Sequence, residues 1–181
     1  KTTDPVIVLA TSGKSFTLDA ANLPSGRGDG APVNTLVNSS SSDIVWMGTG
    51  DPGRPLLMNS SAGLGFLCKL GDLQAKTRQG KDFMSVGEGA TVRRPFELDR
   101  DYRYAAALSS DARLLLFPMD EVPVRPNGGV GVQLLAIPDG ERLAGVAGTD
   151  GKALVVSGVQ RENRATETLG AGQLREHGGK R

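Results

Sequence analysis

The sequence predicts an all-β fold built from four related units of about 50 residues. Three observations support this prediction. Similar segments recur at a fixed spacing, apolar residues alternate with polar ones inside each unit, and glycine or proline interrupts nearly every segment that could form a helix. Glycine and proline number 25 and 10 of the 181 residues, so turns are frequent. We expect one domain over residues 1–181, with units at about 5–50, 51–100, 101–150 and 151–181.

The repeat is carried by matched segments of sequence. Residues 5–33 (PVIVLATSGKSFTLDAANLPSGRGDGAPV) align with residues 55–83 (PLLMNSSAGLGFLCKLGDLQAKTRQGKDF) at an offset of 50. Residues 104–132 (YAAALSSDARLLLFPMDEVPVRPNGGVGV) follow at an offset of 49, which pairs Gly80 with Gly129. Units of this size cannot bury their own apolar faces, so we expect neighbouring units to pack side by side.

A fourth, degenerate copy fills the rest of the chain. Lys152–Val156 take the position of the first strand, and Leu174 aligns with a leucine of the first two units. Gly178 and Gly179 restore the glycine spacing, and about three residues are inserted in the hairpin around 159–164. The copy is recognisable but weaker than the other three.

Within each unit the local pattern is that of β-strands. Phe16 and Leu18 alternate with polar neighbours, and residues 64–70 repeat this period of two. Turn sequences at 12–14 and 61–63 join two apolar runs closely enough to form hairpins. Further strand-like runs bring each unit to about four strands, and these are Val33–Val37, Asp43–Met47, Thr91–Leu98, Val132–Ile137 and Leu143–Ala147.

Apolar residues at equivalent positions are expected to form the core. Phe16, Phe66 and Leu115 stand at the same place in three successive units, and we expect them to form one hydrophobic seam. Three further residues are assigned to the core for their alternation or their apolar neighbours, namely Cys68, Phe117 and Trp46.

The composition excludes several kinds of site. One cysteine and one histidine (His177) cannot build a Cys/His zinc site or an internal disulfide, and a single cysteine favours a reducing cytoplasm. No Walker A motif, metal-ligand cluster or membrane-spanning apolar run is present in the sequence. Tyr102 and Tyr104 are interpreted as structural, because neither an acidic cluster nor an arginine motif accompanies them. We assign no catalytic residue and no metal ligand.

Several phrases of the chain resemble a known family. LPSGRGDGAPV, SAGLGFLCKLGDLQAKTRQGK and LLLFPMDEVPV…GGVGVQLLAIP are similar to the C-terminal domain of the A subunit of bacterial DNA topoisomerase IV. They are similar, more distantly, to the corresponding domain of the DNA gyrase A protein. The resemblance is strongest over residues 5–140 and weak after about 150.

The resemblance implies a β-pinwheel, a propeller-like disc of about four-stranded blades that exchange strands with their neighbours. It implies that double-stranded DNA binds along the perimeter and is bent there, and that the domain itself is not catalytic. The domain would present a DNA segment to the catalytic core of the same polypeptide, tune the preference for DNA topology, and support relaxation and decatenation.

The resemblance also implies where partners and cofactors bind. No cofactor is expected in this domain, because ATP and Mg would bind elsewhere in the parent complex. The expected partners are double-stranded DNA, the rest of the topoisomerase IV A subunit, and the B subunit. The complex would be cytoplasmic and chromosome-associated, without an integral membrane segment and with peripheral membrane association left open.

Two departures from the family pattern qualify these expectations. Gyrase A proteins carry a basic box of the form QRRGGKG, and the nearest string here is REHGGKR at 175–181. This difference favours topoisomerase IV, and bending over full wrapping. Family domains often have five or more blades, whereas four units are visible, so either the chain begins after a first blade or this version is short.

The distribution of charge points to one cluster. The net charge is only +1, so a DNA contact must come from a local patch. The second unit carries 8 basic and 6 acidic groups and the fourth carries 6 and 3, whereas the first and third are more acidic than basic. Lys76, Arg78 and Lys81 surround Gly80, and a glycine lets backbone N–H groups and cationic side chains approach phosphates together.

Other cations are weaker candidates for DNA contact. Some stand beside acidic neighbours or hairpin turns, and three lie at the end of the chain, so each could equally be a solvated surface charge. They are Lys14, Arg27, Lys69, Arg113, Arg125, Arg175, Lys180 and Arg181.

Two other functions compete with DNA binding. A propeller-like protein-interaction module without DNA binding is supported by the near-zero net charge and the acidic third unit. A stand-alone enzyme has little support, because no set of acid, base and nucleophile clusters in the sequence. A duplex-DNA mobility shift at two salt concentrations separates the first alternative from DNA binding.

Overall fold

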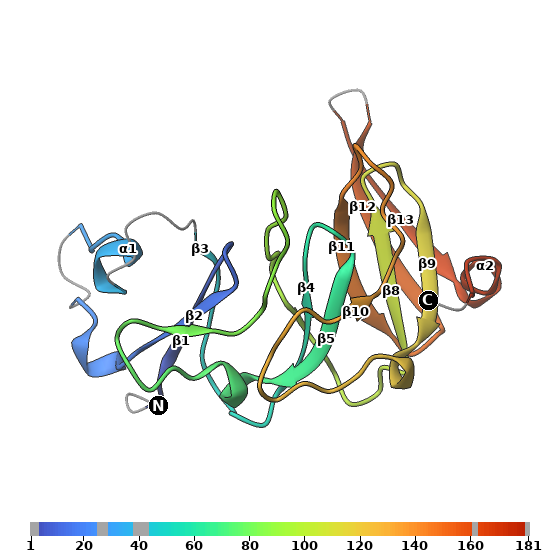
Figure 1. Cartoon of the computed structure of the whole chain (residues 1–181). Helices are drawn as coiled ribbons and strands as arrows, with labels where there is room; N and C mark the ends of the chain where they lie inside the picture. The colour runs from blue at the N-terminus through green and yellow to red at the C-terminus, as the bar shows by residue number, and fades with distance from the viewer. Residues whose placement is uncertain (1–3, 25–28, 38–43, 161–162, 180–181) are drawn as a thin grey trace.

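The first hairpin of the chain forms the centre of a four-stranded antiparallel sheet. The computed structural model describes residues 4–24, 29–37, 44–160 and 163–179. The all-β prediction is confirmed, and the predicted turn around Gly13 joins the first two strands. The order of this sheet is β3-β1-β2-β6, from β1 (Val6–Ala10), β2 (Lys14–Leu18), β3 (Ile44–Gly48) and β6 (Lys81–Asp82) (Figure 1).

The later units repeat this plan with fewer strands toward the C-terminus. The second sheet has the order β10-β5-β4-β7, from β4 (Pro55–Asn59), β5 (Leu64–Lys69), β7 (Phe96–Glu97) and β10 (Val132–Gln133). The third sheet has the order β11-β8-β9, from β8 (Tyr104–Ser109), β9 (Leu114–Pro118) and β11 (Leu143–Thr149). The fourth is a hairpin of β12 (Ala153–Gln160) and β13 (Asn163–Gly170). Its strands are longer than those of the other hairpins, at the place of the predicted insertion.

A helical turn follows the second strand of every hairpin. These turns are 3-10 helices at 20–22, 70–73 and 119–121, and the fourth is α2 (Ala171–Glu176). Leu73, Val122 and Leu174 are buried at the corresponding places and fasten these turns to the sheets.

Strands are exchanged between neighbouring units. β6 belongs to the second unit in sequence but pairs with β2 of the first sheet, where Ser15 lies opposite Lys81. In the same way β10 of the third unit pairs with β5 of the second sheet. Each of the first two sheets is therefore completed by the unit that follows it in the chain.

The hairpin glycines make this exchange possible. Gly13 has a φ of +87°, and its carbonyl oxygen accepts hydrogen bonds from the N–H groups of Phe83 (3.1 Å) and Met84 (3.0 Å). Gly63 has a φ of +77° and accepts in the same way from Leu134 and Leu135. A Cβ atom at either glycine would overlap a backbone oxygen of the incoming segment. Only glycine allows both the left-handed turn and this close approach.

The strand exchange shows which glycine of the third unit is equivalent to Gly80, and it differs from the one expected from the sequence. Ser15 pairs with Lys81 and Gly65 pairs with Val132, so the residues before them, Gly80 and Gly131, are equivalent, at an offset of 51. A Cβ atom on either would approach the carbonyl oxygen of its partner strand, at 2.7 Å and 2.6 Å respectively. The expected pairing of Gly80 with Gly129 is wrong, because sequence alignment cannot register strands that pair across units.

Gly178 likewise does not occupy the position of the repeat glycine that its spacing in the sequence suggested. It forms a parallel bridge with Leu116, as Val124 does with Leu67 one unit earlier. Gly178 therefore takes the place of Val124 and not that of Gly80.

The hydrophobic core is divided among the junctions between units. One cluster, which includes Phe66, lies between the first and second sheets, and another, against which Leu115 packs, lies between the second and third. A fourth cluster joins the third sheet to α2 and β12. Phe16 lies in a separate cluster on the outer side of the first sheet. The expected single seam of Phe16, Phe66 and Leu115 is wrong. Each side chain lies on the face of its own sheet that points toward the N-terminal end of the molecule, so the three residues belong to three different clusters.

The segment predicted as a strand at Val33–Val37 is instead helical. It forms α1 (Val33–Leu36), and Val33 and Val37 pack with Val8, Ala10 and Phe16. Valines four residues apart share one face of a helix, so this short turn covers the apolar outer side of the first sheet. The first sheet already has its four strands without this segment.

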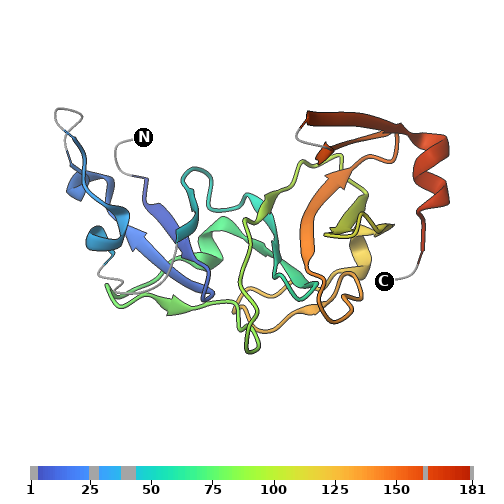
Figure 2. The same cartoon turned by 90° about the horizontal axis from the view of Figure 1, so that it is seen from above.

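The four units follow one another along an open arc. The first sheet and the fourth hairpin lie at opposite ends of the molecule, with the second and third sheets between them (Figures 1 and 2). Among the described helices, none is long and apolar enough to cross a membrane.

Candidate nucleic-acid interface

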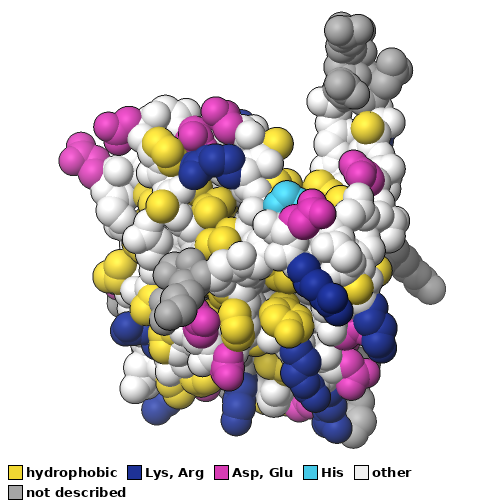
Figure 3. Space-filling view, turned by 90° about the vertical axis from the view of Figure 1, so that its right-hand side faces the viewer, with side chains coloured by type: hydrophobic (Ala, Val, Ile, Leu, Met, Phe, Trp, Pro, Cys, Tyr) yellow, Lys and Arg dark blue, Asp and Glu magenta, His cyan; other side chains and the backbone are white. Residues whose placement is uncertain are grey.

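The loops that follow the second strand of the later hairpins carry exposed cations whose side chains have no ion-pair partner among the described residues. We call the described parts of these loops, residues 70–80, 119–131 and 171–179, the basal loops. In the second and third units they lie at the opposite end of the strands from the hairpin turns (Figure 1). Seen from the C-terminal end, Lys and Arg side chains gather along the lower edge of the molecule with acidic side chains among them (Figure 3).

Lys76 and Arg78 are the two cations of the predicted cluster that face solvent. Both side chains are exposed, and within the described residues neither has an ion-pair or hydrogen-bond partner. The turn that presents them closes with a hydrogen bond from the N–H of Gly80 to the carbonyl of Thr77, at 3.1 Å. Gly80 has a φ of +80° and lies tightly over Phe16, so the turn is fixed to the first sheet.

Lys81 is held inside the loop. Its side chain is half-buried, and its ammonium group donates a hydrogen bond to the carbonyl oxygen of Asp72 at 2.9 Å. The same ammonium group lies 4.9 Å from the centre of the Phe83 ring, a cation–π contact. Lys81 thus connects the basal loop to the core, whereas Lys76 and Arg78 project from it.

Lys69 is exposed at the end of β5. Its backbone N–H donates to the Asp72 carboxylate at 2.8 Å, so an acidic group lies beside this cation. The carboxylate also helps to keep Cys68 neutral, as burial and then the Asp72 charge raise the pKa of its thiol.

Arg125 is half-buried in the third unit. Its backbone N–H donates to Leu67 at 2.7 Å, and its carbonyl accepts from Gly128 at 3.1 Å. Its Nε atom is buried and has no hydrogen-bond partner within the part of the chain that the structure describes. This arginine therefore presents only part of its guanidinium group to solvent.

Two predicted cations at the hairpin turns are paired with acids. The Lys14 ammonium group lies 3.8 Å from Asp82, and the Arg113 guanidinium lies 2.7 Å from Glu141. Arg113 also donates to the carbonyl oxygen of Ala136 at 3.1 Å. Pairing reduces the positive field that either side chain could offer to a phosphate.

The remaining predicted residues lie near or beyond the end of the described chain. Arg175 is exposed in the last turn of α2, and its side chain has no ion-pair or hydrogen-bond partner among the described residues. Three other candidates lie outside the described residues, and they are Arg27, Lys180 and Arg181.

The sequence interpretation missed three arginines of the second unit, one of which contacts the next unit. Arg54 pairs with Glu97 at 2.9 Å, and Arg93 donates to the carbonyl oxygen of Ala144 at 3.0 Å in the next unit. Arg94 is exposed. The only signal in the sequence was the count of eight basic residues in the second unit, because their partners are distant along the chain.

The aromatic residues and the cysteine that the sequence assigned to the core are buried as expected. Cys68, Phe66, Phe117 and Trp46 are all buried, at 6% exposure or less. Tyr102 lies with its ring 6.1 Å from that of Phe96. Among the described residues, no three His, Cys, Asp or Glu side chains form a group that could hold a metal ion.

Comparison with curated proteins identifies relatives over most of the chain. No family model matches it. The A subunit of DNA topoisomerase 4 from Salmonella typhimurium is 34% identical over 148 residues, covering 80% of this chain. The proteins of the same name from Neisseria gonorrhoeae and Escherichia coli K12 are 32% and 33% identical over 84% and 82% of it. The chain spans only about a fifth of the length of these relatives, at 19%, 21% and 20%.

Comparison with solved structures supports the same fold. The Escherichia coli ParC C-terminal domain matches with a TM-score of 0.88 and 27% identity, over 100% of this chain and 75% of that one. A C-terminal domain of DNA topoisomerase IV matches at 0.79, with 15% identity over 94% and 55% of the two chains. The DNA gyrase A C-terminal domain matches at 0.64, with 16% identity over 87% and 52%. These similarities confirm the expected pinwheel architecture.

Proposed function

Because the chain belongs to the family of the C-terminal domains of the DNA topoisomerase IV A subunit, we propose that it binds double-stranded DNA and bends it. The observation that carries the proposal is the exposed pair Lys76 and Arg78, which has no acidic partner among the described residues. A net charge of +1 gives no general attraction to DNA, so such local cations must supply the contact.

The contact would be made to phosphates and would be independent of base sequence. An ammonium and a guanidinium group on a turn can each neutralise one phosphate and release its counterion. Contacts to phosphates position a duplex but carry no sequence information. A topoisomerase module that must act on any DNA segment is served by recognition of this kind.

The open arc supports the bending part of the proposal. Units succeed one another along a curve, so cations on successive basal loops would hold a duplex at several points and not at one (Figure 2). Smoothly bending a site of 20–30 base pairs by 40–90° costs about 1–6 kcal/mol, which a few phosphate contacts can offset.

Within the longer parent protein, this chain would be non-catalytic. It would present the bent segment to the catalytic core of the A subunit and so influence which DNA topology is relaxed or decatenated. ATP and Mg would be bound in other parts of the complex that the A and B subunits form. The site of action would be the chromosome in the cytoplasm.

A mobility shift with two unrelated duplexes of equal length tests the proposal. We expect similar affinities for both sequences, and binding that weakens steeply as salt rises. Fluorescence energy transfer between dyes at the duplex ends should increase on binding, because a bend shortens the end-to-end distance. No shift at low salt would refute DNA binding and favour the protein-interaction module. A shift without increased transfer would refute bending alone.

A further inference from the structure

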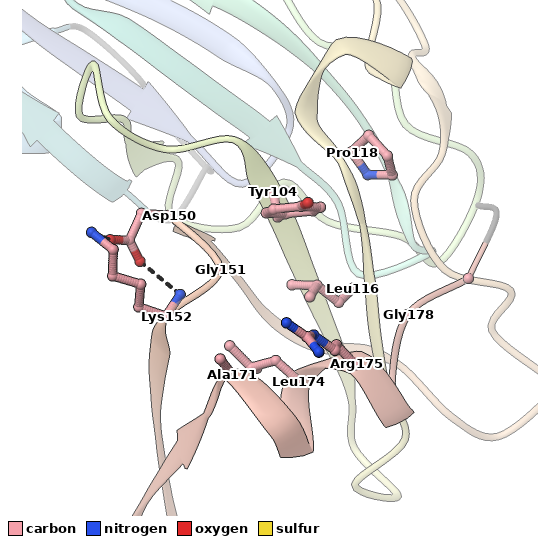
Figure 4. A pocket seen from close by; sticks show the side chains of 11 residues that line it. Tyr104, Leu116, Pro118, Asp150, Gly151, Lys152, Ala171, Leu174, Arg175 and Gly178 are labelled. Carbon is pink, nitrogen blue, oxygen red and sulfur yellow. Dashed lines mark hydrogen bonds and ion pairs between the residues drawn. The ribbon is translucent and has the colours of Figure 1, made fainter.

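A cavity between the third and fourth units holds an arginine whose side chain has no partner among the described residues, beside an exposed tyrosine. Its volume is about 490 Å³, and its walls come from β8, β9, the loop before β12, α2 and the segment after α2 (Figure 4). This volume lies within the range of pockets that bind small molecules or parts of larger ligands. The fold builds the cavity from segments that are distant in sequence.

The floor of the cavity is rigid and apolar. Leu116 and Leu174 are buried in the core between β9 and α2. The backbone of Leu116 donates to the carbonyl of His177 at 2.9 Å and accepts from the N–H of Gly179 at 3.0 Å. The segment after α2 is thereby fastened to the third sheet. The floor can support a ligand without first having to fold around it.

The charges of the cavity leave one cation available. Lys152 lies 3.0 Å from the Asp150 carboxylate, and hydrogen bonds from Lys152 lower the pKa of that carboxyl group. This pair is close to neutral. Arg175 has no such partner among the described residues. The cavity therefore carries about one net positive charge, located on a guanidinium group.

The tyrosine gives the cavity a flat wall. Tyr104 is 38% exposed, and its ring packs beside Gly151, where a Cβ atom would come within 3.0 Å of the ring. In Figure 4 the side chains of Tyr104, Leu116 and Arg175 follow one another along the cavity, with the Asp150–Lys152 pair to one side. An aromatic face and a guanidinium group thus lie along the same wall.

We propose that this cavity binds the sugar–phosphate backbone of DNA, with a phosphate on Arg175 and the adjoining deoxyribose against Tyr104. A guanidinium group can hold two oxygens of one phosphate at once, and an aromatic ring offers an apolar face to a sugar. This inference rests on the proposed DNA binding. It adds a second anchor, on the fourth unit, to the one formed by Lys76 and Arg78 on the second.

Substitutions in the cavity test this inference through the salt dependence of binding to a labelled 20-base-pair duplex. Arg175→Gln should flatten the slope of log K against log salt by about one, because one phosphate contact is lost. Arg175→Lys should preserve the slope but bind more weakly, because an ammonium group cannot form the paired hydrogen bonds. Tyr104→Ala should weaken binding at every salt concentration without changing the slope, because its contact is uncharged.

Arg142→Gln is the matched control. Arg142 is also exposed and has no side-chain partner among the described residues, but it precedes β11 at the hairpin-turn end of the third unit. For Arg142→Gln we expect the slope of log K against log salt to equal that of the unmodified chain. Thermal unfolding of each variant checks that the fold is retained, which Arg175 as an exposed side chain should permit.

Failure of this inference and failure of the proposed function give different results. If the unmodified chain binds the duplex and Arg175→Gln behaves like Arg142→Gln, the cavity does not contact DNA, although the proposed function stands. If the unmodified chain does not bind the duplex, both proposals are refuted. Normal DNA binding by Arg175→Gln with lost binding of an acidic peptide would show that the cavity serves a protein partner.

Discussion

Replacing Gly63 with alanine should test whether the hairpin turn holds the exchanged strand. Gly63 has a φ of +77°, and a Cβ atom there would overlap the Leu135 carbonyl oxygen and approach Ile137 Cγ1 to 2.7 Å. The incoming segment would have to move away. The hydrogen bonds from Leu134 (2.7 Å) and Leu135 (3.3 Å) to the Gly63 carbonyl would then be lost or lengthened.

The expected loss of stability has two parts. A left-handed backbone at a non-glycine residue costs roughly 1–2 kcal/mol. Loss of two hydrogen bonds adds about 1 kcal/mol each. Gly140 offers a matched control, with a φ of +84° and nothing within 4 Å of its Cβ position, so Gly140→Ala should show the backbone cost alone.

Thermal unfolding followed by circular dichroism would measure the difference. For a chain of this size, 1 kcal/mol lowers Tm by about 2–4 °C. The Gly63→Ala variant should therefore unfold roughly 4–8 °C below Gly140→Ala. Equal Tm values would show that the exchanged segment does not depend on the close approach at Gly63, and the argument for the hairpin glycines would fail.

Other variants and measurements extend these expectations. Changing Lys76 and Arg78 together to alanine should flatten the salt slope of duplex binding by about two, with stability changed by less than about 0.5 kcal/mol for each exposed charge. Phe66→Ala should cost about 3–5 kcal/mol in chemical denaturation, because the ring is fully buried at the first junction, whereas the 43% exposed Met47 should tolerate alanine. Cys68 should react with a thiol reagent at pH 8 only after unfolding, because burial raises its pKa. The same raised pKa means that stability should fall as pH rises above about 8.5, the thiol pKa of the unfolded chain.

The local features of the fold were predictable from the sequence. The alternation around Phe16 and Leu18 and the turn at Gly13 predicted β1 and β2, and Trp46 was correctly assigned to the core. The run at Leu143–Ala147 lies within β11. The hairpin of β1 and β2 joins residues close in sequence, and Trp46 and β11 lie in apolar runs, so the local pattern of side chains was sufficient in each case.

The features that depend on exchange between units were not predictable. The Gly80 register follows from pairing between β6 and β2, and alignment of the repeats placed it two residues away. Val33–Val37 has β-branched residues typical of a strand, yet it covers an apolar face as helix α1. The position of Lys81 depends on Asp72 and Phe83, which meet it only after the loop has closed. Tertiary contacts decide these cases, and propensity does not.

Strand exchange delays the completion of each of the first two sheets while the chain is being synthesised on the ribosome. β1 and β2 emerge early, but their sheet lacks its fourth strand until Lys81–Asp82 follow, and the hydrogen-bonded partners Ser15 and Lys81 are 66 residues apart. Domains generally fold from the N-terminus as they are synthesised, at about 5–20 residues per second. The first sheet would therefore wait several seconds with an open edge, and the second sheet would wait in the same way for β10 of the third unit. A pause in translation shortly before residue 81 would prolong the exposure of that edge, which is the kind of surface through which nascent chains aggregate.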